Sequence, residues 1–267
     1  MERVNLYKVN HDTKIGKPCP AHPPNITEDS IFYEGDEVVG FYIKRMPEDM
    51  CKLADLANHE FNSKNVPKTY LDRSDVLQHQ QANPGMTRSQ AREKGTSQMS
   101  VILGAVPPKP QFMRHYGTIS KVHQVPSARN YIKAMLLLAQ KSEELIKKIM
   151  PEQYEKQSAL FNEIDDKWKF ANLFTSSIAN YNISAPFHRD TGNIVGAVNV
   201  IITKRHNCKG GNLHVPDYNA TMDSANNSIL VYPAWRNVHG VTPIEPTYPG
   251  GYRNSLIFYP LKAFQKL

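Results

Sequence analysis

Apolar residues recur at helical spacing in two stretches of the first 170 residues. They return every three or four positions over residues 46–61 and again over residues 130–150, which predicts two amphipathic helices. Pro151 suits the first turn of a third helix that ends near Ile164, and Ser127 is the predicted N-cap of the second. We expect these helices to pack against one side of a sheet.

The other apolar segments are short and lie between turns, which is typical of strands. The predicted strand segments are 31–33, 38–43, 100–103, 175–183, 196–203, 212–216, 228–232, 238–244 and 252–259. Turn sequences such as KGGN, SANN and YPGGY separate the later segments. This spacing predicts an antiparallel sandwich or barrel in the C-terminal part of the chain.

The chain has 267 residues and a mass of 30.3 kDa, which is enough for one substantial hydrophobic core. We expect a single domain over residues 1–267, in which residues 1–170 give helical and loop support and residues 171–267 form the β core. Residues 63–98 are polar and hold few apolar side chains. They are either a mobile tether or a loop that grips the substrate.

Charge is unevenly distributed along the chain. The formal net charge is +7, yet residues 1–50 hold 6 basic and 9 acidic side chains, whereas residues 101–150 hold 8 basic and 2 acidic ones. A basic face that meets a polyanion would explain this distribution. A modest surplus of solvated lysine and arginine explains it equally well, so charge alone leaves nucleic acid open.

The cysteines indicate the compartment. Cys19, Cys51 and Cys208 form no CxxC pair, and the N-terminus shows no secretory pattern, so we expect a reducing compartment without a disulfide framework. This predicts the cytoplasm, or the host cytoplasm for a viral source, with the nucleus left open. No apolar run reaches the roughly 18–20 residues that span a bilayer, so no membrane partner is expected.

Candidate metal ligands lie in the C-terminal third. His188 and Asp190 stand two positions apart in the sequence FHRD, so on one strand both would point to the same face. His239 follows after 48 intervening residues, enough for other strands to fold back and bring it close. Two imidazoles and one carboxylate on one side of an ion are the ligands expected of a non-heme Fe(II) oxygenase.

A second pair lies on the last predicted strand. Arg253 and Ser255 are two apart and face the same side of that strand. A guanidinium offers a bidentate fork to a carboxylate, and a hydroxyl adds one more donor. The alternative is a surface arginine on an edge strand.

These motifs occur in a fixed order: HxD at 188–190, GGNL at 210–213, HG at 239–240 and RNSLIFY at 253–259. Together they resemble the Fe(II)- and 2-oxoglutarate-dependent dioxygenases. The resemblance implies an α+β fold with a double-stranded β-helix core, jelly-roll or cupin-like, braced by N-terminal helices. Within this superfamily the chain resembles the TET/JBP branch of DNA oxygenases most, through APFHRDTGN at 185–193, GGNLHVPDYN at 210–219 and VHGVTPI at 238–244. It lacks a cysteine-rich region, as a compact microbial or viral form would.

The resemblance also implies cofactors, a reaction and site residues. Fe(II) would be held by His188, Asp190 and His239, and 2-oxoglutarate by Arg253 and Ser255. Asn182 is predicted to line the pocket of the cofactor or of the base, although it could equally be a core residue. With O2 as co-substrate, the enzyme would hydroxylate the 5-methyl group of a pyrimidine in DNA, with 5-methylcytosine as the first candidate base and thymine as the second.

DNA is the predicted substrate, and no protein partner is predicted. A duplex base would have to be flipped out of its stack to reach the iron, which requires contacts to phosphates. The basic candidates for these contacts are Arg73, Arg88, Arg92, Lys94, Arg114 and Lys121. Two alternatives stay open: an oxygenase acting on a small molecule or a protein side chain, and a non-catalytic DNA-binding β-helix module.

Overall fold

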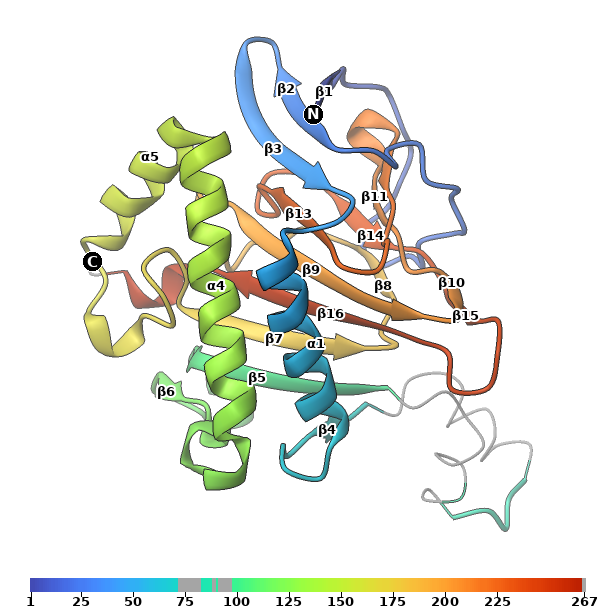
Figure 1. Cartoon of the computed structure of the whole chain (residues 1–267), viewed down its shortest axis with the longest axis vertical. Helices are drawn as coiled ribbons and strands as arrows, with labels where there is room; N and C mark the ends of the chain where they lie inside the picture. The colour runs from blue at the N-terminus through green and yellow to red at the C-terminus, as the bar shows by residue number, and fades with distance from the viewer. Residues whose placement is uncertain (72–82, 88–89, 91–97, 266–267) are drawn as a thin grey trace.

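Two β-sheets lie on either side of a cavity. Helices cover the outer face of the larger sheet (Figure 1). The structure is a computed structural model that describes residues 1–71, 83–87, 90 and 98–265. Within these residues, no helix is both long and apolar enough to span a bilayer.

In the described part of the chain, the larger sheet has ten strands in the order β1-β2-β3-β13-β9-β16-β7-β5-β4, with β6 paired to β5. Neighbouring strands are antiparallel except β1 and β2. The strand bounds are β1 Glu2–Asn5, β2 Ser30–Glu34, β3 Glu37–Ile43, β4 Thr69–Tyr70, β5 Met99–Val106, β6 Thr118–Ile119, β7 Ser176–Tyr181, β9 Asn199–His206, β13 Ser228–Tyr232 and β16 Tyr252–Tyr259. Strands from both ends of the chain therefore share one sheet.

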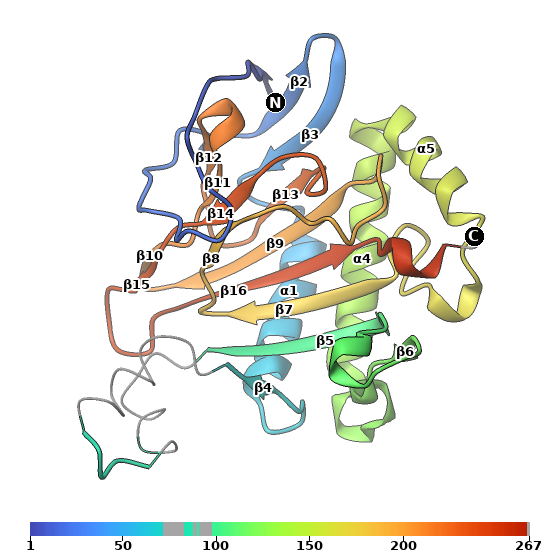
Figure 2. The same cartoon turned by 180° about the vertical axis from the view of Figure 1, so that it is seen from behind.

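The smaller sheet faces the middle of the larger one (Figure 2). Its order is β12-β11-β14-β8, and β10 pairs with β15 beside it. The bounds are β8 Ala185–His188, β10 Cys208–Gly210, β11 Leu213–Val215, β12 Ala220–Met222, β14 His239–Val241 and β15 Ile244–Pro246. This pair of sheets with its bracing helices is the α+β double-stranded β-helix, so the predicted fold class is confirmed.

The three predicted helices are present with small shifts at their ends. They are α1 Glu48–Asn62, α4 Arg129–Ile149 and α5 Pro151–Phe161. The described residues also form the 3₁₀ segments η1 Pro110–Phe112, η2 Lys121–Gln124, η3 Pro126–Ala128, η4 Asp166–Trp168, η5 Pro216–Tyr218 and η6 Lys262–Phe264. The prediction that Ser127 caps α4 was wrong, because η3 precedes the helix and the Ser127 hydroxyl donates to the Asn65 carbonyl instead.

Strand β16 has one face in the hydrophobic core and the other face in the cavity wall. Leu256 and Phe258 are fully buried in the cluster that packs under α1 and α4. Arg253, Ser255 and Ile257 alternate with them and line the cavity on the opposite face. The alternation predicted for this strand therefore separates residues that stabilise the fold from residues that face the site.

Candidate active site

Three side chains that could bind a metal meet at the edge of the smaller sheet. His188 ends β8 and His239 begins β14, and the two are register partners on these antiparallel strands. Their rings lie 4.3 Å apart between centroids, and His188 Nε2 is 3.5 Å from Asp190 Oδ1. One ligand atom from each of the three residues lies within 4.8 Å of the others. The structure thus brings the predicted triad together.

Asp190 reaches the triad by a turn and not by a strand. The predicted strand geometry for the HxD motif was wrong, because β8 ends at His188. The Asp190 amide donates to the Ala234 carbonyl at 3.1 Å, and the Asp190 carbonyl accepts from the Asn193 amide at 3.0 Å. These bonds hold the turn that directs the carboxylate towards the two imidazoles.

Backbone carbonyls fix the orientation of both imidazoles. His188 Nδ1 lies 2.7 Å from the Pro186 carbonyl, and His239 Nδ1 lies 3.1 Å from the Asn237 carbonyl. A carbonyl only accepts, so each Nδ1 carries the proton and each Nε2 keeps a free lone pair. Burial, and then the nearby His188, lowers the pKa of His239 to about 4. His239 is therefore neutral at physiological pH, as a metal ligand must be.

Two buried asparagines support the carboxylate, and the sequence analysis did not predict them. Asp190 Oδ2 accepts from Asn199 Nδ2 at 3.2 Å and from Asn193 Nδ2 at 3.4 Å. Asn193 Nδ2 also donates to Asn199 Oδ1 at 2.9 Å. Amides that hold the outer oxygen leave Oδ1 for the ion and fix the direction of the carboxylate. The available signal was a lone polar residue, Asn199, within the apolar run GAVNVII.

A cavity of about 370 Å³ lies between the two sheets, and the triad forms part of its wall. Strands β7, β9 and β16 line one side, and β8, β11 and β14 line the other. Ile178 of β7 lines this cavity, and its register partner on β5, Ile102, is 36% exposed. Register partners point to the same face, so the apolar wall continues along β5 to the surface.

Arg253 lies in the same cavity as the triad and is a buried cation. Its side chain is 3% exposed, and among the residues that the structure describes no carboxylate forms an ion pair with it. Its Nη1 donates to Ser255 Oγ at 3.2 Å, while its Nε is buried without a partner. Burial lowers the pKa of Arg253 to about 10, which still leaves it positively charged at neutral pH. A buried charge of this kind requires an anion.

Neighbouring residues position Arg253. Asn182 Oδ1 accepts from the Arg253 amide at 2.9 Å, and the Asn182 amide donates to the Arg253 carbonyl at 2.8 Å. Asn182 is thus next to Arg253 but is not part of the cavity wall, and its binding role stays a prediction. Gly211 adopts a φ of +70°, and a Cβ there would lie 2.6 Å from Arg253 Cδ. The glycine of the GGNL motif therefore leaves the space through which the arginine passes.

Of the predicted DNA contacts, the structure describes Arg114 and Lys121, and neither lines the cavity. Arg114 and Lys121 flank β6, which extends the edge of the larger sheet beside β5. The other four candidates, Arg73, Arg88, Arg92 and Lys94, lie outside the described residues. The segment that contains Arg114 carries three large exposed side chains, Phe112, Met113 and Tyr116.

The chain is similar to a known family of oxygenases and to solved structures. The model of a family described as the oxygenase domain of the 2OGFeDO superfamily (Tet_JBP) matches residues 118–262. The chain is also similar to the solved structure of NgTET1 in complex with 5mC DNA, with a TM-score of 0.57 and 12% sequence identity over 96% of this chain and 84% of that one. No curated protein sequence matches.

Two further solved structures show weaker likeness. One is an oxidoreductase of the 2OG-Fe(II) oxygenase family from Burkholderia pseudomallei, with a TM-score of 0.43 and 11% identity over 82% of this chain and 84% of that one. The other is OsALKBH1, with a TM-score of 0.39 and 13% identity over 82% of this chain and 97% of that one.

Proposed function

Because this chain belongs to the Tet/JBP family of oxygenases in the 2OGFeDO superfamily, we propose that it hydroxylates the 5-methyl group of a pyrimidine in DNA. We take 5-methylcytosine as the first candidate base and thymine as the second. Enzymes of this superfamily use Fe(II) and 2-oxoglutarate, and the chain is accordingly an oxygenase. The finer assignment, the DNA base, rests on the arguments that follow.

The donor groups of the cavity fit both cofactors. Two imidazoles and one carboxylate would be suitable ligands for Fe(II). Arg253, a buried cation without a counter-ion among the described residues, suits the distal carboxylate of 2-oxoglutarate, and Ser255 adds a hydroxyl. This unpaired cation in the same cavity as the triad is the observation that carries the proposed chemistry.

The chain's own residues position and shield the reacting groups. When bound, Fe(II) and 2-oxoglutarate supply the oxidising chemistry that transfers one oxygen atom of O2 into a C–H bond. Asn193 and Asn199 hold the outer oxygen of Asp190, so its other oxygen keeps a fixed direction. Ile178 and Ile257 make the opposite wall apolar, which keeps bulk water away from a substrate methyl group.

An exposed apolar and basic segment before β6 supports a nucleic acid substrate. Phe112, Met113 and Tyr116 are 74%, 87% and 82% exposed, and they lie on one segment with Lys109 and Arg114. Apolar and aromatic side chains can stack on bases or enter a base step, and neighbouring cations can contact phosphates. The likeness of the fold to NgTET1, solved with 5mC DNA, is consistent with this proposal.

The decisive experiment is a product assay. The purified protein is incubated with Fe(II), ascorbate, 2-oxoglutarate and duplex DNA that contains 5-methylcytosine or thymine, and the digested nucleosides are analysed by mass spectrometry. We expect a hydroxymethyl nucleoside that requires 2-oxoglutarate and disappears in the His188→Ala variant. Succinate formation without any change in the nucleosides would refute the DNA assignment and indicate a small molecule or a protein side chain as the substrate.

A further inference from the structure

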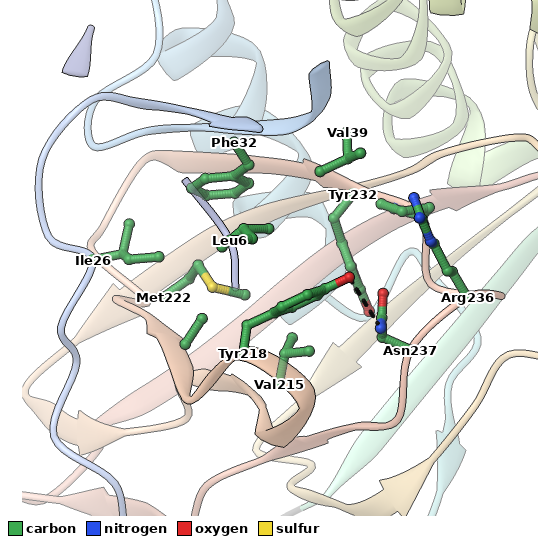
Figure 3. Close-up of a pocket in the computed structure, with 12 residues that line it drawn as sticks. Leu6, Ile26, Phe32, Val39, Val215, Tyr218, Met222, Tyr232, Arg236 and Asn237 are labelled. Carbon is green, nitrogen blue, oxygen red and sulfur yellow. Dashed lines mark hydrogen bonds between the residues drawn. The ribbon is translucent and has the colours of Figure 1, made fainter. Parts of the chain in front are cut away.

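A second, smaller cavity lies between the N-terminal strands and the smaller sheet (Figure 3). Its volume is about 30 Å³, which is room for one or two water-sized molecules. Leu6, Phe32 and Val39 line it from the N-terminal side, and Val215 and Met222 line it from β11 and β12. The wall is therefore mostly hydrocarbon and aromatic surface.

The polar side chains at one end of this small cavity already have partners. Asn237 Nδ2 donates to a carboxylate oxygen of Asp217 and lies 3.4 Å from the Tyr218 hydroxyl. The Arg236 guanidinium forms an ion pair with Glu34. Water needs two to four polar partners to be held in such a space, so an apolar cavity of this kind stays dry and accepts apolar gases.

The small cavity is adjacent to the proposed metal site. Tyr232 lines both the small cavity and the larger one, and its ring meets the His239 ring edge-on at 5.4 Å and 87°. Both cavities are also walled by members of one buried apolar cluster, with Val39 and Val215 on the small cavity and Ile201 and Leu213 on the larger one. The side chain of Tyr232 thus forms a partition between the two spaces.

We propose that the small cavity is a binding site for dioxygen, from which O2 reaches the metal past Tyr232. The larger cavity must accommodate 2-oxoglutarate and the substrate together, so a third reactant benefits from a separate approach. O2 is small and apolar, and it partitions from water into hydrocarbon surroundings. A charged or polar metabolite fits neither the size nor the lining of the small cavity. This inference rests on the oxygenase chemistry and not on the identity of the base.

Xenon tests the cavity without any turnover, because it is apolar and visible by its anomalous scattering. Crystals of the full chain pressurised with xenon should show a xenon atom among Phe32, Val39 and Met222. Ala220→Leu, which adds three carbons to a residue that lines this space, should remove that xenon atom. Wild-type crystals without xenon at this place would overturn the proposal.

Oxygen kinetics then test the role of the cavity. Succinate formation from 2-oxoglutarate without DNA is measured at varied O2 concentration. In Ala220→Leu we expect KM for O2 to rise by about threefold or more, with KM for 2-oxoglutarate unchanged. Ala225→Leu is the matched control, because it adds the same carbons in the turn after β12, outside the cavity wall, and should leave both constants unchanged.

The xenon and oxygen experiments test the small cavity independently of the DNA assignment. If Ala220→Leu does not fold, Ala220→Val makes a smaller addition at the same position and is measured in the same way. An unchanged KM for O2 in a variant that has lost its xenon would overturn the proposal. The DNA assignment would survive that result, since the hydroxymethyl product is assayed independently.

Discussion

The two ends of the larger cavity differ in how far the protein satisfies their polar side chains with hydrogen bonds. At the metal end, His188, His239 and Asp190 each have protein hydrogen bonds on the side that faces away from the proposed ion. At the other end, Arg253 is 3% exposed, and the partner of its guanidinium among the described residues is the Ser255 hydroxyl. The protein itself supplies the hydrogen bonds that orient the side chains of the first end, whereas the charge at the second end requires a carboxylate ligand.

Removal of a metal ligand should reduce activity more than any other substitution in the cavity. Asp190→Ala deletes the only carboxylate of the triad, so we expect 2-oxoglutarate turnover to fall by at least about 100-fold, together with Fe(II) affinity. Succinate release and equilibrium dialysis with Fe(II) measure the two effects. The exposed Glu163→Ala is the control, and wild-type turnover in Asp190→Ala would contradict the proposed ligand set.

Arg253→Met tests the opposite end of the cavity. It should weaken 2-oxoglutarate binding while it stabilises the protein without 2-oxoglutarate. We expect KM for 2-oxoglutarate to rise about 10- to 100-fold, because a hydrogen bond to a charged group contributes roughly 1.5–3 kcal/mol. Without 2-oxoglutarate, the free energy of unfolding should increase by on the order of 1 kcal/mol, because a buried unpaired charge is removed. Succinate formation at varied 2-oxoglutarate measures KM, and urea unfolding without 2-oxoglutarate measures the free energy of unfolding.

The control for Arg253→Met is its register partner on β9. Arg205 has what Arg253 lacks, an ion pair with Asp223 at 3.4 Å and a hydrogen bond to the Cys208 carbonyl at 2.8 Å. Arg205→Met should therefore lower the free energy of unfolding and leave KM for 2-oxoglutarate unchanged. Destabilisation by both substitutions would show that Arg253 already has its partner within the protein.

Asn199→Ala should have a smaller effect, confined to the metal end. It removes the closer of the two amides that support Asp190 Oδ2, so we expect Fe(II) affinity to fall by about tenfold. KM for 2-oxoglutarate, measured at saturating Fe(II), should change little. Titration of Fe(II) against turnover measures the loss, and an unchanged titration curve would count against a supporting role.

The smallest expected effect comes from Gly211→Ala. A Cβ at this position meets Arg253 Cδ at 2.6 Å, so the arginine must move and KM for 2-oxoglutarate should rise by a few-fold, roughly 1 kcal/mol of binding. Gly250→Ala is the matched control, because its φ of +78° carries the same backbone cost while no atom lies within 4 Å of the added Cβ. Equal KM values in the two variants would exclude the steric explanation.

Local sequence patterns predicted one end of the cavity better than the other. The alternation in RNSLIFY was enough to place Arg253 and Ser255 on one face, because strand geometry relates residues two apart. The HxD spacing brought His188 and Asp190 together for the wrong reason, since Asp190 lies in a turn held by Ala234. The motif was sufficient to locate these residues, although not to describe their backbone.

Long-range contacts account for what the sequence analysis missed. Asn193 and Asn199 support Asp190 because the chain after β8 folds back into β9. A local sequence pattern does not predict a contact of this kind. Strand β1, Glu2–Asn5, is mostly exposed, so it lacks the apolar alternation that identifies a strand. It forms because the edge of β2 offers a parallel partner.

The division of β16 between two faces makes its length as important as its composition. Leu256 and Phe258 belong to the helix side, and Arg253 and Ser255 belong to the cavity side. Insertion of one residue at the start of this strand would reverse every side chain after it. The guanidinium would then be forced into the hydrophobic layer while a phenyl ring entered the cavity. Gain or loss of one residue here would thus disrupt the hydrophobic core and the site together. Gain or loss of two residues would leave each side chain on its original face.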